Sequence, residues 1–245
     1  MGEQVWSEPL LQAPHEASDK AQRVRRMFDA IAPRYELVNS LFSAGRDTYW
    51  RRRAVEQARV SATDDVLDVA CGTGDFARAF AAAQPRSVVG CDFAHEMLRR
   101  AKDRSPRTCT WLEADALCLP FAGRRFSIVS CAFGVRNFQD LDAGLREMRR
   151  VLIPGGRAVI LEFIRPSKPW IRRAYEAYST RLMPAAAAWV SGDRTGAYRY
   201  LPRSVNSFLS STQLDNRLLE AGFARCQVTP LTFGIVTLFM AWLDA

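Results

Sequence analysis

Two patterns of hydrophobic residues divide most of the chain into alternating elements. Uninterrupted apolar runs are typical of strands buried in a sheet, and the chain has them at Val66–Ala70, Ser87–Cys91, Thr108–Leu112, Phe126–Ala132, Arg157–Phe163, Phe223–Thr229 and Gly234–Trp242. Between these runs, apolar residues recur at helical spacing in Phe76–Ala83, Glu96–Asp103, Asp142–Val151 and Thr212–Ala221. Strands that alternate with helices predict an α/β domain with a mainly parallel sheet and helices on both faces.

The pattern changes at the start of the chain and again late in it. Residues 1–18 lack the basic start and apolar centre of a signal peptide, so we expect a disordered tail there. Residues 19–245 are expected to form a single domain, with a helical extension at 20–58 and a helical insertion at 165–203. The insertion can cover an apolar substrate tail or pack on the core or on a second copy, so a homodimer stays open.

Composition narrows the classes of partner. The chain has 34 Lys and Arg against 26 Asp and Glu, a net charge of +8, and the basic residues are spread along it. We therefore expect no nucleic-acid binding, whereas peripheral contact with an anionic membrane stays open. The longest apolar run, Phe233–Trp242, is too short to span a bilayer, so we expect no transmembrane segment. Because residues 1–18 show no targeting pattern, we expect a cytoplasmic location. Scattered cysteines and two histidines predict no metal site and no imidazole base.

The strongest local signal is a glycine-rich turn between a predicted strand and a predicted helix, at residues 66–75. Gly72 and Gly74 allow the backbone to pass close to a ligand at the carboxyl end of the strand. A dinucleotide would place its pyrophosphate at the helix N-terminus, where Asp75 would repel it. S-adenosylmethionine has no phosphate and carries an amine and a sulfonium that Asp68 and Asp75 can favour, so we predict this cofactor.

Two further acids follow the next two predicted strands. Asp92 can accept both hydroxyls of a ribose. Asp115 can accept from the adenine amino group, with Ala116 lining the ring. Taken alone, Asp115 is equally compatible with a solvated loop acid.

With these features the chain resembles the menaquinone/ubiquinone biosynthesis C-methyltransferases, the UbiE/MenG family. The motifs that carry the resemblance cover nearly the whole chain: Met27–Tyr35, Asn39, Trp50, the glycine turn, Ala132–Phe138, Glu147–Leu152 with Pro154–Gly156, Leu161–Phe163 and Tyr198–Ser204. The resemblance implies a Rossmann-like class I methyltransferase fold with seven strands, the last one antiparallel. It also implies that Thr73, Asp92, Asp115 and Ala116 contact the cofactor. The chain departs from the family pattern at Phe233 and Phe239.

The acceptor that the resemblance implies is the ring carbon of a prenylated quinol, with demethylmenaquinol favoured over the methoxybenzoquinol precursor of ubiquinone. A non-catalytic protein that binds the cofactor is the rival interpretation. We expect Arg136 to stabilise the quinolate oxygen and Asn137 to orient the ring. The alternative for Arg136 is an ion pair with Asp140 or Asp142. Tyr35 can close the pocket and relay the proton, or it can be a buried core tyrosine.

Overall fold

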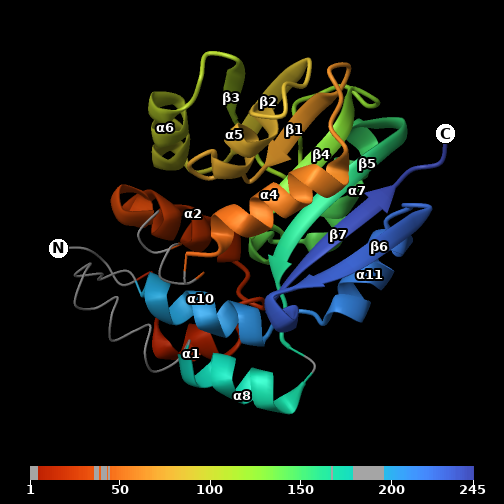
Figure 1. Ribbon diagram of the computed structural model, residues 1–245. Coiled ribbons are helices and arrows are strands. Elements are labelled where there is room, and N and C mark those ends of the chain that lie inside the picture. Colours follow the sequence, from red (N-terminus) through yellow and green to blue (C-terminus); the bar gives the residue numbers. More distant parts are fainter. Residues whose placement is uncertain (1–4, 36–38, 40–42, 44, 167, 179–195) are drawn as a thin grey trace.

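Seven strands form one sheet in the order β3-β2-β1-β4-β5-β7-β6 (Figure 1). The strands are β1 (Asp65–Val69), β2 (Ser87–Asp92), β3 (Cys109–Glu113), β4 (Phe126–Ala132), β5 (Leu152–Phe163), β6 (Arg225–Leu231) and β7 (Val236–Trp242). β7 lies antiparallel to both β5 and β6, and the other pairs are parallel. The expected fold, a mainly parallel sheet of seven strands with an antiparallel last strand, is confirmed.

The computed structural model describes residues 5–35, 39, 43, 45–166, 168–178 and 196–245. Within these ranges the helices are α1 (Glu8–Gln12), α2 (Lys20–Ile31), η1 (Ala32–Arg34), α4 (Asp47–Ala58), α5 (Asp75–Ala81), α6 (His95–Arg104), η2 (Val135–Asn137), α7 (Leu141–Val151), α8 (Pro169–Ala177), α10 (Ala197–Asn206), α11 (Ser211–Glu220) and η4 (Thr232–Gly234). No helix of this described part combines the length and the apolar character needed to cross a membrane.

Helices cover both faces of the sheet. Successive residues of a strand point to opposite faces, so neighbouring residues of β1 pack against different helices. On one face Val66 of β1 shares a buried cluster with Trp50 of α4. On the other face its neighbour Leu67 shares a cluster with Leu145 of α7. Both faces are therefore dry, which explains why the strands appear in the sequence as uninterrupted apolar runs.

Residues 5–18 are not a disordered tail, so that expectation is wrong. Trp6 is fully buried and stacks on Tyr200 of α10, with ring centroids 4.3 Å apart. Leu11 of α1 is 1% exposed, and Glu8 pairs with Arg199 at 3.2 Å. The partners of this segment lie about two hundred residues further along the chain, so the local composition alone could not reveal them.

Four helices from opposite ends of the sequence gather beyond the carboxyl ends of the parallel strands (Figure 1). α1 and α2 belong to the N-terminal part, and α8 and α10 belong to the predicted insertion. Residues 179–195 of that insertion lie outside the described residues. The helices α1, α2, α8 and α10 thus form a cap over the edge of the sheet where ligands bind in this class of fold.

Candidate active site

A pocket opens at the carboxyl ends of β1 and β4, the point where the strand order reverses. Ligands bind at this switch point in open α/β sheets. Six of the predicted site residues line the pocket, and they come from five separate segments: Tyr35, Gly72, Asp92, Asp115, Ala116 and Asn137. The remaining predicted residues, Asp68, Thr73, Gly74 and Arg136, are not part of this lining.

The two glycines of the loop after β1 have different roles. Gly72 has a φ of +55° and lines the pocket, and a Cβ there would lie 3.6 Å from the ring of Tyr35. Gly74 has a φ of +82°, and a Cβ there would lie 2.5 Å from the indole of Trp111. We expected both glycines to admit a ligand, but only Gly72 faces the pocket. Gly74 is needed for the turn and for packing under the indole.

Asp92 at the end of β2 fixes the loop and still faces the pocket. Its Oδ2 accepts from the amide of Gly72 and its Oδ1 from the amide of Ala94, both at 2.8 Å. Burial raises the pKa of Asp92 to about 6, although these two hydrogen bonds act in the opposite direction. Each carboxylate oxygen can accept a second hydrogen bond, so Asp92 retains acceptors for a pair of hydroxyl groups.

Asp115 and Ala116, which follow β3, also line the pocket. The Oδ1 atom of Asp115 accepts from the backbone amide of Leu117 at 2.9 Å, which fixes the turn. Its side chain remains exposed, so Oδ2 can accept from a donor such as an amino group on a flat ring.

Asp68 is fully buried beneath the loop and lacks one hydrogen bond. Its Oδ1 accepts from the hydroxyl of Ser130 at 2.7 Å, whereas Oδ2 has no partner among the described residues. A cavity of about 20 Å³ adjoins Asp68, Tyr35 and Arg51, which is room for one water-sized group. Burial raises the pKa of Asp68 to about 7. A buried carboxylate with a free oxygen fits a cationic group, so the site suits the amine of an amino acid.

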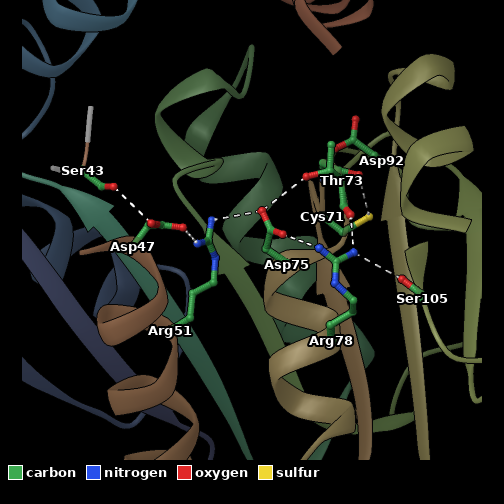
Figure 2. A network of polar contacts seen from close by, with 10 residues as sticks. Ser43, Asp47, Arg51, Cys71, Thr73, Asp75, Arg78, Asp92 and Ser105 are labelled. Atoms are coloured by element: carbon green, nitrogen blue, oxygen red, sulfur yellow. Dashed lines mark hydrogen bonds and ion pairs between the residues drawn. The ribbon is translucent and has the colours of Figure 1, made fainter. Parts of the chain in front are cut away.

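The sequence analysis missed Arg51, a buried guanidinium between α4 and α5 (Figure 2). Arg51 pairs with Asp47 at 2.5 Å and lies 3.7 Å from Asp75. Asp75 also pairs with Arg78, so this acid is bound within the protein and is not free to favour a ligand as we expected. The spacing of four residues between Asp47 and Arg51 is visible in the sequence, but the approach of α4 to the glycine loop is not.

Thr73 lies inside this network rather than on the pocket wall. Its hydroxyl donates to Asp75 at 3.3 Å, and its carbonyl accepts from Arg78 at 2.7 Å (Figure 2). The side chain is 1% exposed. Thr73 therefore holds the loop from within, and any contact with a ligand would be made by the loop backbone beside it.

Arg136 in η2 is committed to a buried ion pair. Its Nη1 lies 2.5 Å from Oε1 of Glu162 at the end of β5, and it also donates to the carbonyl of Phe133 at 2.7 Å. Arg136 is 4% exposed and Glu162 is 0% exposed. Burial raises the pKa of Glu162, against the opposing effect of the guanidinium. This geometry favours a bracing role for Arg136 over contact with a quinolate.

The alternative expectation for Arg136, an ion pair with Asp140 or Asp142, is wrong about the partner. Asp140 is the N-cap of α7 and accepts from the amide of Ala143 at 2.9 Å. Asp142 pairs with Arg217 at 2.8 Å on the surface. Glu162 is 26 residues from Arg136 in the chain and reaches it because β4 and β5 are neighbours in the sheet.

Asn137 and Tyr35 lie on the pocket wall, as expected. The Oδ1 atom of Asn137 accepts from the hydroxyl of Tyr200 at 2.9 Å, and its Nδ2 donates to the carbonyl of Phe133 at 3.3 Å. These bonds fix the orientation of the amide and leave one N–H free to donate. Tyr35 packs edge-on against Phe28, with centroids 5.8 Å apart. Burial raises the pKa of Tyr35, so its phenol stays neutral at neutral pH.

Two residues that the sequence did not single out fasten the η2 loop to the N-terminal helix. The ammonium of Lys20 donates to the carbonyls of Arg136 at 3.0 Å and Phe138 at 2.6 Å. Gln139 accepts from the amide of Ala21 at 2.9 Å. Burial, together with the charge of Arg136, lowers the pKa of Lys20 to about 8. A single lysine in the first turn of a helix gives no sequence signal for such a contact.

Known proteins match both the sequence and the fold. The model of the ubiE/COQ5 methyltransferase family matches residues 16–243. The chain belongs to this family. Demethylmenaquinone methyltransferases of Deinococcus radiodurans and Thermus thermophilus are 42% and 45% identical to it. The alignments cover 91% and 86% of this chain and 93% and 97% of those proteins. The resemblance inferred from the motifs is thereby confirmed.

Solved structures of more distant proteins share the fold of this family member. An S-adenosylmethionine-dependent methyltransferase from Thermotoga maritima aligns with a TM-score of 0.66 at 16% identity, over 89% of this chain and 99% of that one. A second one, from Aquifex aeolicus, aligns with a TM-score of 0.60 at 15% identity, over 85% and 97% of the two chains. The Rossmann-like methyltransferase fold is therefore confirmed.

Proposed function

We propose that this protein transfers a methyl group from S-adenosylmethionine to the ring carbon of a prenylated quinol, with demethylmenaquinol as the acceptor and menaquinol as the product. The observation that carries the proposal is the near-complete alignment with relatives named demethylmenaquinone methyltransferase. The pocket supports it, because its lining combines two acids, Asp92 and Asp115, with apolar and aromatic side chains.

The acids and the glycine loop of the pocket fit S-adenosylmethionine, which supplies a methyl group on a positively charged sulfur. Asp92 would accept from the two ribose hydroxyls, and Asp115 would accept from the adenine amino group beside Ala116. The free oxygen of Asp68 would take the amine of the amino-acid end, directly or through one water in the small cavity. The backbone of Gly72 would pass close to the ligand. Buried acids also favour the cationic sulfur electrostatically.

The apolar and aromatic part of the pocket lining suits a flat ring. Phe28 and Phe133 belong to this part, and the free N–H of Asn137 would donate to an oxygen of the quinol. The neutral phenol of Tyr35 would donate to the quinolate oxygen and lower the pKa of the substrate hydroxyl. The hydroxyl proton would pass to water, so the ring carbon beside that oxygen becomes nucleophilic without a strong base. After methyl transfer, the proton on that carbon would also be lost to water, which restores the aromatic ring. Holding the donor methyl group close to the acceptor ring carbon and in line with it lowers the remaining activation barrier.

The test is transfer of labelled methyl from S-adenosylmethionine to reduced demethylmenaquinol, with cofactor affinity measured separately by calorimetry. Tyr35→Phe is expected to lower kcat by about tenfold to a hundredfold while leaving cofactor affinity unchanged. Tyr49→Phe, at an exposed tyrosine of α4, is the matched control and should have no effect. Cofactor binding without any transfer to a quinol would refute the proposal in favour of a non-catalytic binding protein.

A second acceptor has specific support. A relative from Geobacter sulfurreducens, 42% identical over 91% of this chain, is named ubiquinone/menaquinone biosynthesis C-methyltransferase UbiE. The methoxybenzoquinol precursor of ubiquinone should therefore be tested in parallel. Label in both quinols would mean that one pocket serves both rings, and label in the naphthoquinol alone would restrict the enzyme to menaquinone.

A further inference from the structure

Two aromatic side chains stand in solvent where large apolar groups are normally buried. Phe233 is 78% exposed and Trp170 is 66% exposed, the highest values for large hydrophobic residues in the described ranges. Phe233 belongs to η4, the turn between β6 and β7, and Trp170 to the first turn of α8. Neither side chain contributes to the core.

The two segments are neighbours although more than sixty residues separate them. The amide of Ile164, just after β5, donates to the carbonyl of Ile235 at 3.0 Å, which ties the start of the α8 segment to the η4 turn. Tyr175 of α8 shares a buried cluster with Leu231 and Val236, the residues that flank η4. The helix α8 lies on the capped side of the molecule, beyond the carboxyl end of β5 (Figure 1), and these two contacts place the η4 turn beside it.

The turn holds Phe233 outward at a conformational cost. Phe233 has a φ of 59°, in the left-handed region that bulky residues disfavour, and Thr232 before it has a φ of 44°. The indole of Trp50 donates to the hydroxyl of Thr232 at 2.7 Å, so the turn is anchored from beneath. Packing among the residues that the structure describes does not explain a strained turn that exposes a phenyl ring, whereas an external partner does.

The charges around the aromatics indicate the chemistry of that partner. Positions 164–177, which include α8, carry four basic residues and one acid, Glu176, and positions 228–237 carry no charge. Lys168 and Arg173 are exposed on the same segment as Trp170. Aromatic rings beside basic side chains match the boundary between headgroups and acyl chains of an anionic bilayer.

We propose that Trp170, Phe233, Lys168 and Arg173, here called the tip patch, dock the enzyme onto the surface of an anionic lipid bilayer. The two rings enter the headgroup region, and the two cations contact lipid phosphates. The proposal rests on the proposed function in one respect, since a prenylated quinol is dissolved in the bilayer. Docking at the cap brings the pocket towards that supply of substrate.

The test measures co-sedimentation of the full chain with vesicles of phosphatidylglycerol and phosphatidylethanolamine, and with neutral phosphatidylcholine vesicles. Phe233→Asn removes the ring and suits the left-handed turn, so the fold is retained. We expect Phe233→Asn and Trp170→Ser each to weaken binding to anionic vesicles by about tenfold. Lys168→Gln and Arg173→Gln should each weaken it by about fivefold, and added salt should do the same.

Leu219→Ser is the matched control, because Leu219 is an exposed apolar residue of α11 at 43% exposure and should leave binding unchanged. Equal vesicle binding by wild type and the Phe233→Asn, Trp170→Ser double variant would overturn the proposal. So would a wild type that binds no vesicles, as expected if a protein covers the patch instead. Methyl transfer to a short-tailed, water-soluble quinol should be unaffected by the patch variants. If the wild-type protein does not methylate this soluble quinol, the proposed acceptor is wrong and the docking proposal is unaffected.

Discussion

Replacing Glu162 by glutamine removes the only negative partner of a buried guanidinium among the described residues. The two side chains, 0% and 4% exposed, meet at 2.5 Å. Glutamine keeps the shape but only one of the two oxygens that accept from the amides of Arg136 and Phe163. The change therefore removes the negative charge together with one hydrogen bond. Breaking a buried pair from one side costs about 3–5 kcal/mol of unfolding free energy, because an uncompensated charge stays in the interior. Such a loss is a large part of the roughly 5–15 kcal/mol that a domain possesses.

The assay is equilibrium unfolding in urea, with the slope m checked for constancy between variants. Asp142→Asn is the matched control, since Asp142 pairs with Arg217 at 2.8 Å while both side chains are 40–45% exposed. We expect that control to cost less than about 1 kcal/mol. A loss below about 1 kcal/mol for Glu162→Gln as well would refute the reasoning.

A double variant separates bracing from catalysis at Arg136. Combining Arg136→Met with Glu162→Gln removes both charges, and we expect it to be more stable than Glu162→Gln alone by on the order of 2 kcal/mol. If Arg136 only braces the η2 loop, turnover should recover together with stability. Recovered stability with turnover still lost would instead favour the quinolate contact expected from the sequence.

Three further outcomes follow from the site. Burial raises the pKa of Asp68 to about 7, so the folded state holds a proton that the unfolded state releases near pH 4. The unfolding free energy should therefore fall as the pH rises from about 4 to 7, by up to about 1.4 kcal/mol per pH unit. In urea titrations of Asp68→Asn this dependence on pH should be weaker. Gly74→Ala should cost about 1–3 kcal/mol by thermal unfolding, because φ is +82° and the new Cβ would meet the Trp111 indole at 2.5 Å. Lys20→Met leaves the carbonyl of Phe138 without its 2.6 Å donor, so we expect a loss of about 1–3 kcal/mol in urea and faster amide hydrogen exchange in the η2 loop.

The sequence by itself determined the sheet and the parts of the site that are local to it. Strands buried on both faces are continuous apolar runs, and their order of alternation with helices restricts the topology. The loop that contains Gly72 follows the end of β1, and Asp92 is the last residue of β2. Because parallel strands end at the same edge, their place in one pocket could be predicted without coordinates. The family motifs added the methyl donor and the class of acceptor.

Only the tertiary structure decided which charges remain available. Asp75 forms ion pairs with Arg51 and Arg78, and Arg136 forms one with Glu162. Asp68, in contrast, has an oxygen without a hydrogen-bond partner among the described residues. Each of these outcomes depends on the distance between elements that lie far apart in the chain. A sequence lists the charged groups but not the distances and burial that set their energies, which vary steeply with both.

The N-terminal segment illustrates the same limit for packing. We expected disorder at residues 1–18, yet Trp6 is buried against Tyr200 and Leu11 is 1% exposed. The burial of an apolar ring stabilises a short helix only when a matching surface exists elsewhere, and here α10 supplies that surface. The sequence determines which groups can be buried, and the fold determines which of them find a partner.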